Sequence, residues 1–120
     1  MVAHFLLEKP MPLIKSRSNT FKLKVTVPQI AEGGDVIEST VTLISRRVTE
    51  TEFQDLIKQP PADLVKRVIV GWPEGEVLDQ NNDPIPFSEQ NLAEQIDDPH
   101  VVRAISREFV TKLATLPEKN

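Results

Sequence analysis

The chain has no cysteine and no tyrosine, one tryptophan, five phenylalanines and four glycines among its 120 residues. Without cysteine it cannot form a disulfide, supply a thiolate nucleophile or build a cysteine-based metal site. The scarcity of aromatic residues indicates a core made mostly of aliphatic side chains. The length suits one ordinary domain with its own core.

Long apolar segments are also absent. The longest runs, Phe5-Leu6-Leu7 and Val68-Ile69-Val70, fall far short of the roughly 20 residues that a membrane-spanning helix needs. The start of the chain lacks the basic residues and apolar stretch of a secretory signal. A formal net charge of −4 argues against binding a nucleic-acid backbone as the main activity. We therefore expect an intracellular domain that engages neither membrane nor nucleic acid.

Residues 1–20 are predicted to form an arm, residues 21–116 the domain and residues 117–120 a short tail. Pro10 and Pro12 prevent a continuous helix in the arm, and the polar run that follows is typical of a turn. The apolar side chains of the arm either cross a neighbouring surface or fold back on their own core. The candidate partner-binding residues are Phe5, Leu6, Leu7 and Leu116.

Two strands are predicted by an apolar residue at every second position. In the first, Phe21, Leu23, Val25 and Val27 share one face, while Lys22 and Lys24 lie on the other. The second runs from about residue 36 to 45, with Ile37, Val41 and Leu43 on its inner face. Because Gly33-Gly34-Asp35 has the composition of a turn, the two strands are predicted to pair as an antiparallel hairpin.

The middle of the chain has the pattern of a capped helix followed by a strand. Thr49 and Glu52 form a capping box. The Thr49 side chain accepts from the amide of the third helical residue, and the Glu52 side chain reaches back to the amide of the cap. The helix is expected to run to Pro60-Pro61, and a short helical piece over residues 62–66 follows. A strand over residues 68–70 then carries Trp72. The apolar face of the capped helix comprises Phe53, Leu56 and Ile57.

The last third is predicted to contain a turn, a return strand and two helices. Residues 79–83 form the turn, and Pro84 and Pro86 place the return strand at a sheet edge. Ser88 caps the first helix, with Phe87 and Leu92 as its hydrophobic staple. Asp98 caps the second, and Pro99 takes its first position. That helix buries Val102, Ile105, Phe109 and Leu113, and exposes a Glu108–Lys112 pair.

The resulting fold class is a small α+β domain, with antiparallel β-hairpins packed against three to four helices and a C-terminal helical pair.

No constellation of residues points to catalysis, a metal or a cofactor. Asp79-x-Asn81-x-Asp83 imitates the start of a calcium loop, but Pro84 replaces the required glycine, so turn formation is the preferred interpretation. Ser88, Asp98 and His100 suggest a triad only if Ser88 and Asp98 are not helix caps. Asp97-Asp98 is explained by the positive end of a helix dipole. Trp72 is interpreted as a core anchor, with a partner hot spot as the alternative.

One stretch of the sequence resembles a known family. Trp72 is followed by a turn, by Pro84-Ile85-Pro86-Phe87-Ser88, by Asn91-Leu92, and by Asp98-Pro99-x-Val101-Val102-x-Ala104-Ile105. This order is similar to the carboxy-terminal pattern of the tail assembly chaperones of long-tailed bacteriophages. Asn81-Asn82 stands where that pattern has a glycine, and asparagine tolerates the same backbone geometry.

The resemblance implies a non-enzymatic protein of the host cytoplasm that is absent from the mature virion. Its partners would be the tape measure protein, which it keeps soluble, and the tail tube protein. Self-association and a longer form made by ribosomal frameshifting near Lys119 are also expected, and no cofactor is implied. The alternative is a structural virion component, such as a head–tail joining or tube-associated protein. A small enzyme is a third and weaker alternative.

Overall fold

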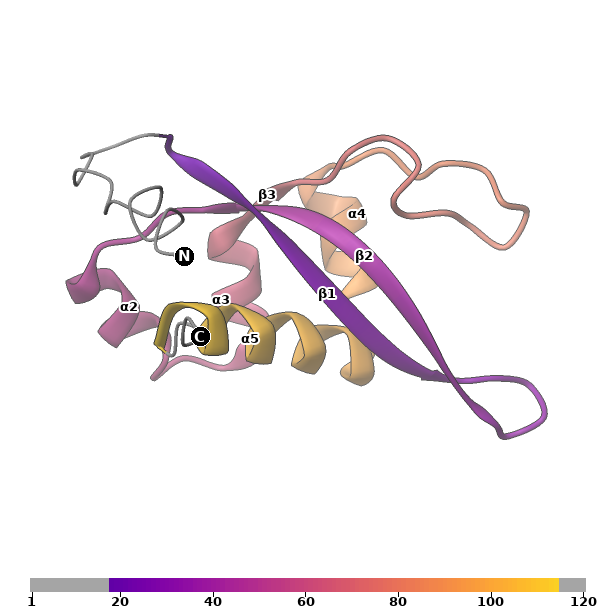
Figure 1. Ribbon diagram of the computed structural model, residues 1–120. Coiled ribbons are helices and arrows are strands. Elements are labelled where there is room, and N and C mark those ends of the chain that lie inside the picture. The colour runs from indigo at the N-terminus through magenta and orange to yellow at the C-terminus, as the bar shows by residue number, and fades with distance from the viewer. Residues whose placement is uncertain (1–17, 115–120) are drawn as a thin grey trace, which may run out of the picture.

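The computed structural model describes residues 18–114, so most of the predicted arm and the whole tail lie outside the described residues. The described chain is a small α+β domain with a three-stranded antiparallel sheet and four helices, which confirms the predicted class. The strand order in the sheet is β1-β2-β3 (Figure 1). In chain order the elements are β1 (Thr20–Ile30), β2 (Val36–Arg46), α2 (Glu50–Leu56), α3 (Pro61–Val68), β3 (Ile69–Gly71), α4 (Glu89–Gln95) and α5 (Pro99–Ala114).

The first two strands form the predicted hairpin. They pair antiparallel from Thr20 opposite Arg46 to Ile30 opposite Val36. Burial alternates along β1 as predicted: Leu23, Val25 and Val27 are buried, while Lys22, Lys24 and Thr26 on the other face are exposed. The turn is closed by the amide of Gly34, which donates to Ala31 O at 2.8 Å, and Gly34 has a φ of 93° that favours glycine.

The hairpin extends beyond the helices of the domain (Figure 1). β3 pairs with β2 only near its end, at Ile44–Gly71 and Ser45–Ile69. The tip of the hairpin therefore projects past the helices, as Figure 1 shows. Ile37 has the same parity as the inner residues Val41 and Leu43, as predicted, but it lies in this uncovered part and is 48% exposed.

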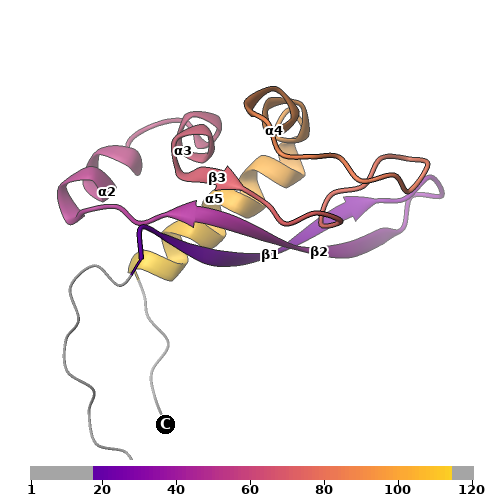
Figure 2. The same ribbon diagram turned by 90° about the horizontal axis from the view of Figure 1, so that it is seen from above.

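The core lies between one face of the sheet and the helices. α5 packs against β1, and α3 packs against α5. Phe109 of α5 is fully buried, and its ring centroid is 6.4 Å from that of Phe53 in α2. Of the predicted stripe on α5, Ile105 and Phe109 are buried, and Val102 and Leu113 pack at the margin of the core. The opposite face of the sheet carries no helix among the described residues (Figure 2).

The first helix is shorter than the sequence predicts. Thr49 caps it as expected, because its hydroxyl accepts from the Glu52 amide at 3.1 Å. The prediction that the Glu52 side chain reaches back to the cap is wrong, because its carboxylate pairs with Arg46 of β2 at 2.8 Å. The helix ends at Leu56 rather than near Pro60, and Ile57 is 42% exposed instead of buried.

Two further expectations need correction. Val68 is the last residue of α3 and not part of the strand, which contains only residues 69–71. Glu108 and Lys112 form no ion pair; the ion pairs within residues 18–114 are Arg46–Glu52 and Arg67–Asp55. Both surface pairs contribute little to stability. The α5 prediction is otherwise confirmed, because the helix runs from Pro99 past Leu113.

Candidate partner-binding groove

Trp72 anchors the long loop that follows β3. It is 6% exposed, and its indole Nε1 donates to Ile85 O at 2.8 Å. The Phe87 ring meets the indole edge-on, with centroids 4.9 Å apart and planes at 86°. These contacts confirm the interpretation of Trp72 as a core anchor, since a buried indole needs a partner for its N–H. They also fold the loop over residues 73–87 back on itself.

The predicted return strand is replaced by a minimal β-like pairing. A single bridge joins Leu78 to Pro84, and the Ile85 amide donates to Val77 O at 2.8 Å. The strand cannot continue because Pro84 and Pro86 lack amide hydrogens and cannot take part in a ladder as donors.

The turn between Asp79 and Asp83 uses the Asp79 carboxylate locally. Its Oδ1 accepts from the amides of Asn81 at 2.8 Å and of Asp83 at 3.0 Å. This geometry confirms turn formation over the calcium-loop alternative. Asn82 has a φ of 66°, which is the left-handed conformation expected where the related pattern has glycine.

The two C-terminal helices are capped as predicted. The Ser88 hydroxyl accepts from the Asn91 amide at 3.0 Å, and the Asn91 side chain donates to Pro86 O at 2.8 Å. Asp98 Oδ1 accepts from the His100 amide at 2.8 Å, and Pro99 is the first residue of α5. Two of the three candidate triad residues, Ser88 and Asp98, therefore serve as caps. Leu92 of α4 is buried, and Pro84 and Pro86 remain exposed.

An open groove of about 310 Å³ lies where the hairpin leaves the helices. Its walls come from the inner face of β1 and β2, the loop after β3, the end of α4 and the start of α5. In Figures 1 and 2 the hairpin tip and this loop project from the same end of the molecule. The apolar lining residues are Val27, Val41, Leu43, Trp72, Val77, Leu78, Leu92, Val101 and Ile105.

The polar margin of the groove carries negative charge. Glu76 lines it beside Gln29, Ser39 and Gln95, and its carboxylate accepts from the Thr42 amide at 2.6 Å. That bond satisfies an amide of β2 beyond the point where β3 ends, and so holds the loop against the hairpin. Among residues 18–114, no lysine or arginine lines the groove. Its chemistry therefore suits an apolar segment better than an anionic ligand.

The structure brings together only some of the residues that the sequence analysis singled out. Trp72 and Leu92 line the groove, whereas Phe87, Ser88, Asn91 and the prolines support the loop and helix beside it. The predicted partner-binding residues Phe5, Leu6, Leu7 and Leu116 lie outside the described residues. The sequence analysis did not identify four residues that line the groove: Val27, Val41, Val77 and Leu78. Nothing in their pattern distinguishes a wall of an open groove from a closed core.

Two negative findings apply to residues 18–114. No group of three or more histidine, aspartate or glutamate side chains is placed to hold a metal ion. None of the helices there has the length and apolar character needed to cross a membrane.

Comparisons with protein-family models, with curated proteins and with solved structures gave no match to this chain.

Proposed function

We propose that this protein is a tail assembly chaperone of a long-tailed bacteriophage, which binds the tape measure protein without catalysing a reaction. The observation that carries the proposal is the groove. Trp72, Leu92, Val101 and Ile105, which belong to the stretch that resembles the chaperone family, converge on its apolar lining. A binding surface built from these residues supports a role in covering an apolar segment of another protein.

The groove has the properties that transient binding requires. Burying an apolar side chain contributes about 1.5–3 kcal/mol, and association itself costs several kcal/mol. A groove that buries a few side chains of its client therefore binds with modest affinity. Such a complex yields to a competitor that binds the client better, as tail tube subunits would during polymerisation. On this proposal the protein acts in the host cytoplasm and is absent from the virion.

A matched pair of variants tests the site. Leu78 and Ile57 are exposed to similar extents, at 48% and 42%, but only Leu78 lines the groove. Leu78→Asp should weaken binding of a helical tape measure fragment about tenfold, the equivalent of about 1.4 kcal/mol. Ile57→Asp should leave binding unchanged. Isothermal titration calorimetry measures both, and equal effects of the two substitutions would remove the groove from the proposal.

Genetics and virion composition test the role itself. Deleting the gene should give filled heads without tails, and the protein should be missing from purified particles. Normal tails after deletion would contradict the chaperone role. Stoichiometric protein in virions would favour the structural alternative, a head–tail joining or tube-associated component. Mass spectrometry of infected cells should also find a minor longer product that shares this sequence and extends it from near Lys119.

A further inference from the structure

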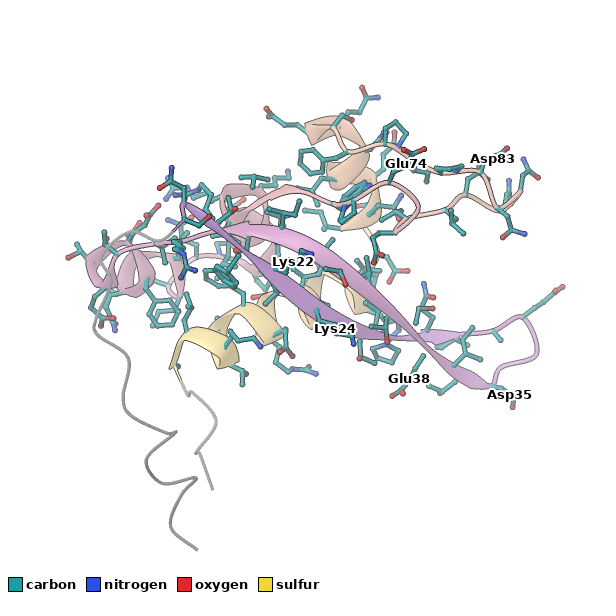
Figure 3. The ribbon with its side chains drawn as sticks, turned by 45° about the horizontal axis from the view of Figure 1, so that its top comes forward. Lys22, Lys24, Asp35, Glu38, Glu74 and Asp83 are labelled. Carbon is teal, nitrogen blue, oxygen red and sulfur yellow. The ribbon has the colours of Figure 1, made fainter. Side chains whose placement is uncertain are left out.

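The face of the hairpin opposite the core is open and divided by charge along its length. On this face the cross-strand rows are Lys22–Ile44, Lys24–Thr42, Thr26–Thr40, Pro28–Glu38 and Ile30–Val36. The lysines occupy the end nearest the helices. Glu38 lies near the tip, close to the exposed turn residues Glu32 and Asp35. Figure 3 shows the labelled Glu38 and Asp35 toward the tip of the hairpin, and the labelled Lys22 and Lys24 farther back along it.

The two charged ends do not neutralise each other within one molecule. Lys24 and the Pro28–Glu38 row are separated along β1 by roughly 13 Å at about 3.3 Å per residue. This separation exceeds the Debye length of about 8 Å at physiological salt. Neither Lys22, Lys24 nor Glu38 takes part in the two ion pairs found within residues 18–114.

Exposed apolar side chains accompany the charges at both ends. At the tip, Ile30 is 64% exposed and its cross-strand neighbour Val36 is 70% exposed. Near the lysines, Ile44 is half-buried and Val70 of β3 is 42% exposed. β3 is too short to cover the tip, and no described helix lies on this face. These exposed apolar side chains on one open face are available for contact with another protein.

We infer that this open face binds the same face of a second copy, antiparallel, about a two-fold axis through the Thr26–Thr40 row. Such an axis places the Lys24–Thr42 row of one copy over the Pro28–Glu38 row of the other. It places the Lys22–Ile44 row over the apolar Ile30–Val36 row. Each of these contacts forms twice, as in any isologous dimer. Because this axis lays each strand over the same strand of the partner, Ile44 lies over Val36, and Lys24 lies diagonally across from Glu38.

The size of the face sets the strength of the dimer. A hairpin of 11-residue strands is roughly 36 Å long and about 10 Å wide, or about 700 Å² in total for two copies. Stable interfaces bury about 1,200–2,000 Å². The dimer should therefore be weak, with a dissociation constant in the micromolar to millimolar range, and should weaken as salt screens its charges.

Charge reversal of two exposed residues tests the inference on the full chain. Lys24→Glu and Glu38→Lys each bring like charges into diagonal positions of the facing rows, at both symmetric contacts. Each variant alone should dimerise roughly tenfold more weakly than the natural chain. An equimolar mixture of the two variants should regain the affinity, because both contacts then join opposite charges. Sedimentation equilibrium over a concentration series at low and at high salt measures all these states.

Two control variants test whether the effect is specific to the open face. Lys66→Glu and Glu94→Lys make the same charge changes on exposed helix positions and should leave dimerisation unchanged. A monomer at every concentration at low salt would overturn the inference. Occupation of the face by residues 1–17 of the same chain would give that result. Reversed variants that dimerise normally, a mixture that regains nothing, or masses that grow beyond a dimer would overturn it as well. Because neither a tape measure protein nor a tail tube protein is used, the result is independent of the proposed function.

Discussion

Replacing Trp72 by phenylalanine isolates the hydrogen bond that holds the loop over residues 73–87. The variant keeps an aromatic ring in the core but removes the indole N–H, so Ile85 O loses its donor at 2.8 Å. Leaving this partly buried carbonyl unpaired costs about 1–3 kcal/mol, and the smaller ring loses packing area. We expect Trp72→Phe to lower the free energy of unfolding by about 2–3 kcal/mol. That is a large share of the 5–15 kcal/mol typical of a domain.

Urea unfolding followed by far-UV circular dichroism measures this loss, since the variant lacks the only tryptophan. Phe87→Leu is the matched comparison, because it keeps the hydrogen bond and removes only the edge-on ring contact. It should cost about 0.5–1.5 kcal/mol beyond the lost area. Hydrogen exchange adds a local readout: the amides of Asp79 and Ile85, bonded to Asp83 O and Val77 O, should exchange faster in Trp72→Phe. A loss below about 0.5 kcal/mol with unchanged exchange would refute the anchoring role.

Two other substitutions probe local backbone features of the same loop and helix. Ser88→Ala removes the cap of α4 and should destabilise the domain by about 1 kcal/mol, while Ser88→Asp should retain most of the stability. Asn82→Gly should be neutral or slightly stabilising at a φ of 66°, whereas Asn82→Val should cost about 1–2 kcal/mol. Thermal unfolding compares each pair, and the opposite order within either pair would contradict the assigned geometry.

The features that sequence predicted well are those fixed by near neighbours in the chain. The alternation from Phe21 to Val27 predicted β1 because side-chain direction in a strand depends on parity alone. The caps at Thr49, Ser88 and Asp98 were predicted because each bonds an amide two or three residues away.

The features that sequence predicted poorly depend on what covers each segment. Ile37 has the correct parity for an inner face, but no helix reaches that far along the hairpin. Glu52 does not complete the capping box, because the fold brings Arg46 near it and the two side chains form an ion pair at 2.8 Å. The groove could not be predicted for the same reason. Val27 and Val41 have the pattern of core residues, and only the position of the loop leaves them lining an open surface.

The client groove and the proposed two-fold contact lie on opposite faces of the same two strands. The groove uses Val27 and Val41 on the inner face, whereas the two-fold contact uses Lys24 and Glu38 on the outer face. A dimer would therefore keep both grooves accessible and could hold a long client at two points. Two weak sites that act together bind more tightly than either alone, provided that the client spans them. The Lys24→Glu variant should then bind a single-site fragment normally but lose affinity for a longer one, and equal loss for both fragments would show that the faces are not independent.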